Sequence, residues 1–352
     1  MICAAVDLFC GIGGLTKGLS LSGINVVAGI DIDNSCSFAY EKNNSSKFLN
    51  KDVTNILSDE LNSLYPKNAI KILVGCAPCQ PFSKYTNRYR KEGQLDDKWK
   101  LLYTFSRFIR EIQPEIVSME NVPELEKESV FIDFKKVLVD LNYQVQEQIV
   151  YCPDYGVPQN RKRLVLLASK FGKIQLIDPI CTKDNYLTVR KVIGKLPFLK
   201  DGQKDINDPL HQACKLSDIN LERIKQSVPG GTWRDWDKKL QLNCHKRKTG
   251  KSYPSVYGRM KWDEPSPTIT TQFYGYGNGR FGHPEQNRAI SLREGALLQS
   301  FPRNYIFIDE DHMFTKRQLG THIGNAVPVA LGKAIGLSIK KHLKEVLNNE
   351  EK

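Results

Sequence analysis

Short apolar runs alternate with amphipathic segments over the first 170 residues of the chain. Contiguous β-branched and other apolar residues predict strands, and the segments between most of them carry apolar residues at helical spacing. The predicted strands are residues 4–9, 25–30, 70–74, 115–119, 144–151 and 164–168. This alternation is typical of an α/β fold with a doubly wound sheet, which binds ligands outside the carboxyl ends of its strands.

The pattern breaks down after about Asp178. Residues 179–290 are rich in Lys, Asn, Gly and Pro, so we expect a second, smaller domain of loops and short strands. Helical spacing returns in residues 291–299 and 327–346, and the longer of these helices should pack back on the first domain. The chain is therefore expected to divide into residues 1–178, 179–290 and 291–352.

The overall composition is that of a soluble globular protein, with 40% apolar and 26% charged residues in a chain of 352. No segment approaches the roughly 20 apolar residues needed to cross a bilayer. No basic leader precedes the short apolar run at the N-terminus. We therefore expect a cytoplasmic protein with no membrane partner, whose nine cysteines are reduced thiols.

The formal net charge is +12, and most of the excess lies in one stretch. Between Lys183 and Trp262 the sequence has 18 Lys and Arg against 8 Asp and Glu. A surface that neutralises phosphates has this character, and so does a merely solvated surface. Charge alone therefore leaves a nucleic-acid partner as one of two interpretations.

The stretch DLFCGIGGLTKGL runs from a predicted strand through a glycine turn into a helix. Gly11, Gly13 and Gly14 permit close approach of the backbone to a ligand, although a tight turn alone would also explain them. Asp31 ends the second strand about 20 positions later, where a carboxylate can hold a ribose hydroxyl. Asp52, in NKDVT at the end of a further short predicted strand, could accept a hydrogen bond from an adenine amine. A nucleoside cofactor is favoured, and S-adenosylmethionine fits better than NAD because the dinucleotide spacing is absent.

The stretch GCAPCQPFS contains Cys76 and Cys79, and three functions suit two cysteines at this spacing. A redox pair is disfavoured, because a long polar and basic loop follows in place of an immediate helix. A zinc site is disfavoured because no second pair of ligands completes a set of four, so no metal is expected. A nucleophilic cysteine remains, and such a residue benefits from partners that favour its thiolate.

Candidate partners lie near two other strand ends. Glu120 and Asn121 end the strand in VSMENVPEL, where a carboxylic acid can project into the same cleft as a cysteine from the neighbouring strand. Arg161 and Arg163 in PQNRKRLVLLAS point to one side as the next strand begins, and an adjacent cation favours a thiolate. Each motif alone also has an ordinary explanation as a cap, an ion pair or a solvated edge.

Six motifs in order along the chain resemble those of the DNA (cytosine-5)-methyltransferases of bacterial and phage restriction-modification type. They are FCGIGG at residues 9–14, PCQ at 78–80, ENV at 120–122, QxRxR at 159–163, REGALLQSFP at 293–302 and GNAVP at 324–328. The resemblance covers nearly the whole chain. It implies a Rossmann-like S-adenosylmethionine-dependent methyltransferase domain (1–178), a smaller irregular target-recognition domain (179–290), and a hinge helix with a returning C-terminal helix (291–352).

The resemblance implies transfer of a methyl group from S-adenosyl-L-methionine to C5 of a flipped-out cytosine in duplex DNA, with S-adenosyl-L-homocysteine as product. It makes Cys79 the nucleophile that adds to C6, and Cys76 a bystander where the family often has a small residue. Glu120 matches the group that protonates N3, Arg163 matches the residue that holds O2, and Arg161 supports the site. The base that removes the C5 proton is not identified by the sequence.

The resemblance also implies the binding residues. Those expected at the cofactor are Phe9, Gly11, Gly13, Gly14, Asp31, Ile32, Asp52, Val53, Pro78, Asn325 and Val327. Those expected at the DNA are Ser83, Lys84, Arg88 and Arg90 in the loop after Cys79, with Thr270 and Thr271 in the variable region. The expected partner is double-stranded DNA, bound by a monomer at the nucleoid and paired in function with a cognate restriction endonuclease.

Two alternatives stay open at this point. One branch of the family modifies tRNA, but its Cys-Phe-Thr signature and short recognition region are not found here. An inactive relative would bind nucleic acid and cofactor without chemistry, and the intact Cys79, Glu120 and Arg163 argue against such decay.

Overall fold

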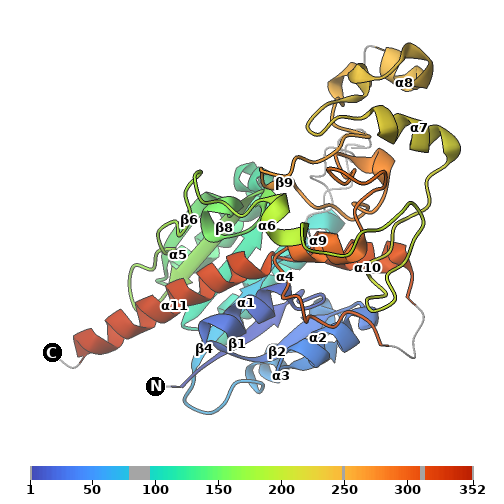
Figure 1. The fold of residues 1–352 in the computed structure, drawn as a ribbon. Coiled ribbons are helices and arrows are strands. Elements are labelled where there is room, and N and C mark those ends of the chain that lie inside the picture. Colours follow the sequence, from blue (N-terminus) through green and yellow to red (C-terminus); the bar gives the residue numbers. More distant parts are fainter. Residues whose placement is uncertain (1, 79–95, 248–249, 310–313, 351–352) are drawn as a thin grey trace.

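The computed structural model describes residues 2–78, 96–247, 250–309 and 314–350. Figure 1 shows a central sheet with helices on both faces and an irregular extension at one end. Of the helices within these ranges, none has the length and apolar character that a bilayer crossing requires.

The central sheet has seven strands in the order β3-β2-β1-β4-β5-β8-β6. Strands β3, β2, β1, β4 and β5 run parallel, and β8 is antiparallel to both of its neighbours. The strands are β1 (Cys3–Leu8), β2 (Asn25–Asp31), β3 (Lys47–Asn50), β4 (Ile70–Gly75), β5 (Ile116–Asn121), β6 (Gln144–Tyr151) and β8 (Lys162–Ser169). The predicted α/β fold is confirmed, and each predicted strand is present with its ends shifted by no more than two residues.

Alternate strand residues serve two separate cores, one on each face of the sheet. Val6 and Leu73 belong to the core under α4 and α5, whereas Ala5, Ile72 and Val74 belong to the core under α1 and α11. A strand whose residues are buried on both faces needs a continuous apolar run, which is why the central strands were recognisable in the sequence. The helices of this part are α1 (Gly14–Ser22), α2 (Ser37–Asn43), α3 (Ser58–Asn62), α4 (Asp96–Ile112) and α5 (Ser129–Asp140).

The C-terminal helix α11 (Val329–Glu350) runs alongside α1, as expected from its amphipathic pattern (Figure 1). Two glycines allow the helices to approach closely. A Cβ on Gly18 would lie 2.5 Å from the carbonyl carbon of Gly332, so a larger residue would push α11 away. Leu331, Ile335 and Ile339 of α11 then pack in the same core as α1.

Residues 179–290, which we call the irregular region, consist mainly of loops and short helices. Among the described residues of this region, extended structure is limited to the short strand β9 (Ser266–Pro267), which pairs with β7 (Gln159–Asn160), and to isolated bridges such as that between Arg259 and Gly282. Gly, Pro and Asn interrupt the alternation that a strand needs, and short helices form instead. These helices are α6 (Val189–Ile193), α7 (Asp218–Gln226) and α8 (Asn243–Lys246), with 3-10 helices at Trp233–Asp235, Lys238–Leu240, Gly250–Ser252 and Tyr276–Asn278. Further 3-10 helices in the first part lie at Asn34–Cys36, Val53–Asn55, Pro123–Lys127 and Cys152–Tyr155.

Two helices join the irregular region to the sheet. The predicted helix α9 (Leu292–Leu298) begins with a capping box between Ser291 and Glu294. Helix α10 (Lys316–Asn325) was not predicted. A Cβ on Gly324 would lie 2.5 Å from the carbonyl carbon of Thr270, so the irregular region rests directly on α10.

Candidate active site

The glycine turn after β1 is packed tightly except at one position. Phe9, Gly11 and Gly13 have positive φ angles of 59°, 50° and 82°. A Cβ on Gly13 would lie 2.6 Å from the Asn44 amide nitrogen, and one on Gly14 would lie 2.3 Å from a backbone oxygen of the segment after α10. A Cβ on Gly11 would meet no atom within 4 Å. Gly11 therefore borders open space, where a ligand can approach the backbone.

Asp31, at the carboxyl end of β2, holds this turn in place. Its Oδ2 accepts a hydrogen bond of 2.8 Å from the backbone N–H of Gly11, and its Oδ1 accepts one of 2.9 Å from Asp33. The contact with Gly11 was not foreseen from the sequence. A carboxylate can accept about four hydrogen bonds, so these contacts leave capacity for a ribose hydroxyl. Next to Asp31, the Ile32 side chain is 70% exposed.

Asp7, within β1, is a buried carboxyl group below the turn. It accepts a hydrogen bond of 2.6 Å from the Thr16 hydroxyl of α1. Burial raises the pKa of Asp7 to about 7, and this effect exceeds the opposite effect of the Thr16 contact. The pair links the strand to the helix that follows the glycine turn.

Asp52 and Val53 lie beyond the end of β3. Asp52 caps the following 3-10 helix, and its Oδ1 accepts hydrogen bonds of 2.9 and 2.8 Å from the N–H and hydroxyl of Thr54. These hydrogen bonds lower the pKa of Asp52. The Val53 side chain is 4% exposed and belongs to the core, so only its backbone is available to a ligand.

The segment after α10 closes the glycine turn from the other side. The Val327 backbone oxygen is the atom that a Cβ on Gly14 would meet, so these two segments are in direct contact. Asn325 is exposed beside them, and Pro78 is exposed beyond the end of β4. The predicted cofactor residues thus come from the ends of β1, β2, β3 and β4 and from the end of α10.

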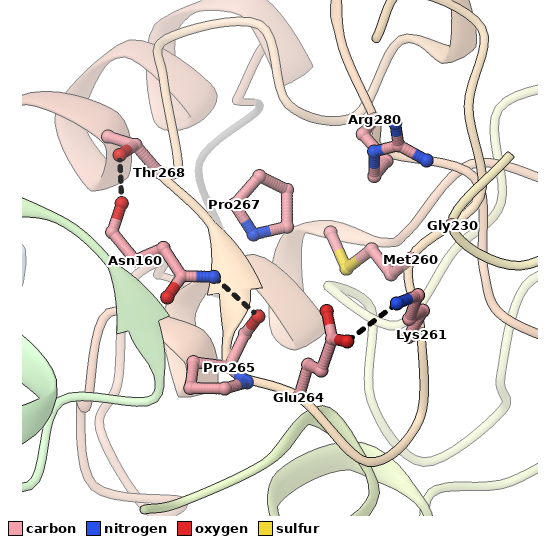
Figure 2. Close-up of a pocket in the computed structure, with 9 residues that line it drawn as sticks. All are labelled: Asn160, Gly230, Met260, Lys261, Glu264, Pro265, Pro267, Thr268 and Arg280. Carbon is pink, nitrogen blue, oxygen red and sulfur yellow. Dashed lines mark hydrogen bonds and ion pairs between the residues drawn. The ribbon is translucent and has the colours of Figure 1, made fainter. Parts of the chain in front are cut away.

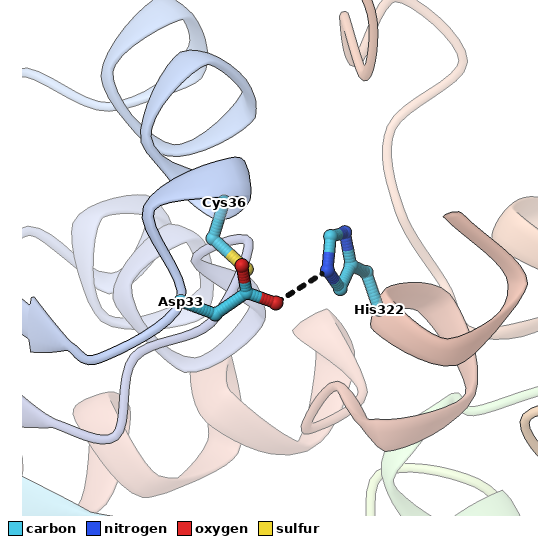
Figure 3. A group of neighbouring side chains, drawn as sticks. All are labelled: Asp33, Cys36 and His322. Atoms are coloured by element: carbon cyan, nitrogen blue, oxygen red, sulfur yellow. Dashed lines mark hydrogen bonds and ion pairs between the residues drawn. The ribbon is translucent and has the colours of Figure 1, made fainter. Parts of the chain in front are cut away.

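Asp33, Cys36 and His322 form a cluster that joins α10 to the chain after β2 (Figure 3). His322 Nε2 lies 2.9 Å from Asp33 Oδ2. The three possible ligand atoms lie within 4.8 Å of one another, and Cys, His and Asp are donors that zinc uses. The ion pair already gives His322 and Asp33 partners without a metal. His322 had no signal in the sequence, because its partner lies 289 positions away.

The carboxyl ends of β4 and β5 bring the next group together. Glu120 is 2% exposed, and its Oε1 lies 2.9 Å from Nε of Arg163. Its Oε2 accepts a hydrogen bond of 2.9 Å from the Cys76 thiol. Oε1 accepts no hydrogen bond from the described residues, so its contact with Arg163 is an ion pair. The chain thus assembles a buried carboxyl group with a cation on one oxygen and a thiol on the other.

Arg161 lies behind this group and is 4% exposed. Its Nη1 donates to the backbone oxygen of Ile269 at 3.3 Å, and its Nε has no hydrogen-bond acceptor among the described residues. Burial lowers the pKa of Arg161 to about 9, and the charge of Arg163 adds to this effect. The guanidinium therefore links the site to the irregular region.

Two glutamine side chains form a buried network that sequence reasoning did not foresee. Gln159 Nε2 donates to Gln299 Oε1 at 2.7 Å and to the Leu298 carbonyl at 3.0 Å. Gln159 Oε1 accepts from the Ile269 N–H at 3.0 Å, and Gln299 Nε2 donates to the Ile323 carbonyl at 2.8 Å. The network ties β7, α9, α10 and the irregular region together. Both glutamines lie within the motifs quoted from the sequence, which was the available signal.

Several predicted residues lie outside the part of the chain that the structure describes. These are Cys79, Ser83, Lys84, Arg88 and Arg90. Of the other residues expected at the DNA, Thr270 is exposed and Thr271 is half-buried.

A cavity of about 410 Å³ lies between β7 and the irregular region (Figure 2). Asn160 lines the cavity and donates to the Pro265 carbonyl at 3.1 Å, and Lys261 pairs with Glu264 at 2.6 Å. None of the predicted site residues lines this cavity. Successive residues of a strand face opposite sides, so the cavity and the Gln159 network lie on opposite sides of β7.

Comparison with known proteins gives one consistent result. Residues 3–341 match the C-5 cytosine-specific DNA methylase family. The type II methylase M.HgiDII of Herpetosiphon aurantiacus is 56% identical over 346 residues, which cover 97% of this chain and 96% of that protein. The type II methyltransferase M.Eco47II of Escherichia coli is 30% identical, with 97% of this chain and 80% of that protein covered.

The fold is also that of solved methyltransferase structures. The solved structure of Entamoeba histolytica methyltransferase EhMeth has a TM-score of 0.63 at 18% identity, covering 97% of this chain and 99% of that one. At this identity the likeness concerns the fold alone. The family follows from the sequence match over nearly the whole length: the chain belongs to the C-5 cytosine-specific DNA methylases.

Proposed function

We propose that this cytosine-C5 DNA methyltransferase works through a covalent bond between Cys79 and C6 of a cytosine rotated out of the duplex. The observation that carries the proposal is the buried Glu120 carboxyl group, with Arg163 at 2.9 Å, at the end of the strand beside the one that leads to Cys79. Family membership and this grouping support the same chemistry.

The reaction needs a nucleophile because C5 of cytosine is unreactive. The Cys79 thiolate forms a bond to C6, the electron pair of the C5–C6 bond becomes available at C5, and N3 takes a proton from Glu120. Arg163 holds O2 of the base, and Arg161 supports Arg163 from behind. S-adenosylmethionine supplies the methyl group to C5 and leaves as S-adenosylhomocysteine. A base then takes the C5 proton, which re-forms the C5–C6 double bond and releases the Cys79 thiolate, and N3 returns its proton to the Glu120 carboxylate.

The cofactor site fits the open space beside Gly11. In this proposal Gly11, Gly13 and Gly14 admit the methionine end, which Asn325 and Val327 enclose from the other side. Phe9 and the exposed Ile32 flank the adenine, Asp31 binds the ribose, and Pro78 borders the methyl group. Asp52 and the backbone of Val53 bind the adenine edge. The exposed apolar Ile32 beside the Asp31 carboxylate supports an occupant that is part apolar ring and part polyol.

The duplex must release the target base, because C6 is shielded while the base is stacked. Rotation costs a few kcal/mol, which contacts to the vacated position offset. We assign these contacts to Ser83, Lys84, Arg88 and Arg90, and we assign sequence reading to residues 179–290, with Thr270 and Thr271 at the DNA. The division into catalytic, recognition and returning segments (1–178, 179–290 and 291–352) belongs to this proposal.

The biological setting follows from the relatives. M.HgiDII and M.Eco47II are type II enzymes, so we propose a type II restriction-modification role, with a cognate endonuclease as the functional partner. A single asymmetric site needs no second copy, so we propose a monomer acting on DNA in the cytoplasm.

The test is methyl transfer from tritiated S-adenosylmethionine to plasmid DNA or to tRNA, with Cys79→Ser alongside the wild type. We expect label in DNA, none in tRNA, and none with the variant. Bisulfite sequencing of the plasmid then identifies the site, beginning with the sequence that M.HgiDII modifies. Label in tRNA alone, or label in DNA with Cys79→Ser, contradicts the proposal.

A further inference from the structure

We propose that Cys76 is a positioning residue for Glu120, and not a bystander. Its thiol holds the carboxyl group in the orientation from which Glu120 acts on the base. The inference rests on the role proposed above for Glu120. It gives a chemical reason for the first cysteine of GCAPC, which the nucleophile alone does not explain.

The contact is built into the sheet. Strands β4 and β5 are parallel neighbours, and their register ends with Gly75 opposite Met119. Cys76 and Glu120 are therefore the next pair across the two strands, and their side chains meet at 2.9 Å between Sγ and Oε2. Every residue of β5 is buried, so the base of the Glu120 side chain has little freedom to move.

A second contact fixes the chain that leads away from Cys76. The Asn121 side-chain amide donates to the backbone oxygen of Ala77 at 3.0 Å. The last two side chains of β5, Glu120 and Asn121, thus contact the two residues that follow β4, Cys76 and Ala77. The distance between Cys76 and Glu120 is set by these two strands and does not depend on a flexible segment.

The two oxygens of Glu120 have different partners. Oε1 faces the Arg163 guanidinium at 2.9 Å, and Oε2 faces the Cys76 thiol. Oε1 accepts no hydrogen bond from the described residues, so the Cys76 thiol on Oε2 supplies the directional contact that orients this buried carboxyl group. Without Cys76, rotation about the last side-chain bond would let Glu120 turn toward Arg163 and away from the base.

The choice of sulfur also has a consequence for proton transfer. A thiol is a weak donor and a weak acceptor, so it can stay paired with Glu120 in either protonation state. A hydroxyl is a stronger donor and would favour the ionised carboxylate, whereas a methyl group offers no donor at all. A general acid must carry its proton when the base is bound, so the side chain at position 76 sets how readily Glu120 does so.

The experiment measures single-turnover methyl transfer to plasmid DNA by wild type, Cys76→Ser and Cys76→Ala, from about pH 5.5 to about pH 9. We expect Cys76→Ala to lower the rate about fivefold at neutral pH, as loss of a hydrogen bond worth about 1 kcal/mol requires. In the plot of rate against pH, we also expect the alkaline limb, where the rate falls at high pH, to move to higher pH. We expect Cys76→Ser to keep most of the neutral rate and to move that limb to lower pH. Affinities for DNA and S-adenosylmethionine should not change.

Opposite movements of the alkaline limb are the decisive result, because a purely structural defect would not depend on the donor strength of the side chain. Cys3→Ala is the matched control, since Cys3 lies at the amino end of β1, opposite the carboxyl ends of the strands where Glu120 and Cys76 meet. Profiles that match the wild type, or that move in the same direction for both variants, overturn the inference. If Cys76→Ala does not fold, Cys76→Ser alone must still move the limb to lower pH.

Cys79→Ser, measured in parallel, separates the two proposals. If this variant retains methyl transfer, the proposed mechanism fails whatever the Cys76 variants do. If it is inactive while both Cys76 variants behave like the wild type, only the role of Cys76 fails.

Discussion

The sheet and the irregular region are held together in different ways. In the sheet, apolar side chains alternate between two extensive cores, and each contributes a share of the stability. The irregular region has one small apolar cluster of its own among the described residues, and other apolar residues such as Ile269 and Phe273 join a core shared with α9 and α10. Buried polar groups organise the loops between these clusters.

Arg259 is the main example of such a polar group. Its guanidinium is 4% exposed and donates to the backbone oxygens of Ser227, His283, Gln286 and Ile224 at 2.8, 2.8, 2.6 and 2.9 Å. Loops carry backbone oxygens that accept no hydrogen bond within a strand or helix. One guanidinium group has five N–H donors and can pair with several of these oxygens. A single guanidinium thus connects several loops of the irregular region, whereas in the sheet each side chain contributes one share of the packing.

The largest expected effect on stability is in the apolar core between the sheet and α5. Phe134 of α5 is fully buried and packs edge-to-face on Phe105 at 5.3 Å between ring centroids. Phe134→Ala should lower the free energy of unfolding by about 4 kcal/mol through lost burial and a cavity. Denaturant unfolding followed by circular dichroism measures it. A loss below about 1 kcal/mol would mean that the core collapses around the gap and that distributed packing is not what holds the sheet.

Arg259→Ala should have a slightly smaller effect, confined to the irregular region. Four backbone oxygens lose their donor, and the expected loss is about 3 kcal/mol. Hydrogen exchange should show lost protection in residues 218–290, with β4 and β5 unchanged. Binding of S-adenosylhomocysteine should survive while DNA binding is lost. Equal loss of protection in β4 and β5 would contradict the division between the two regions.

Acid should weaken the irregular region before the sheet, through His283. Burial lowers the pKa of His283 to about 3, against about 6.5 when unfolded. The unfolded chain therefore binds the proton first, so the stabilisation is complete above pH 6.5 and is lost as pH falls toward 3. Between pH 7 and pH 5 the expected loss is about 2 kcal/mol. Thermal melts of wild type and His283→Gln across this range test it, because the variant should lose this pH dependence.

The smallest expected effect concerns the link between α10 and the end of β2. Burial would raise the pKa of Asp33, but hydrogen bonds from Ser35 and His322 lower it. This stabilisation is present above the ordinary pKa of Asp, about 3.8, and is lost at lower pH. The carboxylate is half-exposed, so Asp33→Asn should cost less than about 1 kcal/mol at neutral pH. A larger loss of melting temperature, measured with and without S-adenosylhomocysteine, would mean that this contact holds the cofactor end together.

The same contrast explains what the sequence could predict. The central strands β1, β4 and β5 were found because burial on both faces leaves a continuous apolar run. The irregular region was expected to contain loops and short strands, and it has one short strand, β9, with several short helices, because it is shaped by contacts such as those of Arg259 across 24 to 35 positions. Local patterns carry no information about such contacts.

The candidate site divides in the same way. Glu120 and Arg163 come from neighbouring strand ends, and the strand order of a doubly wound sheet explains why they meet. The contacts of Asp31 with Gly11, of Cys76 with Glu120, and of Asp33 with His322 depend on side-chain directions that no motif spacing fixes.

The most direct test of the central claim uses duplex DNA containing 5-fluorocytosine at the target position, incubated with the protein and S-adenosylmethionine. Fluorine cannot leave C5 as a proton does, so the bond between sulfur and C6 should persist under denaturing conditions. We predict one protein–DNA adduct, which peptide mass spectrometry maps to Cys79. Methylation of ordinary cytosine at that position without any adduct on the fluorinated duplex, or an adduct mapped to Cys76, would contradict the account.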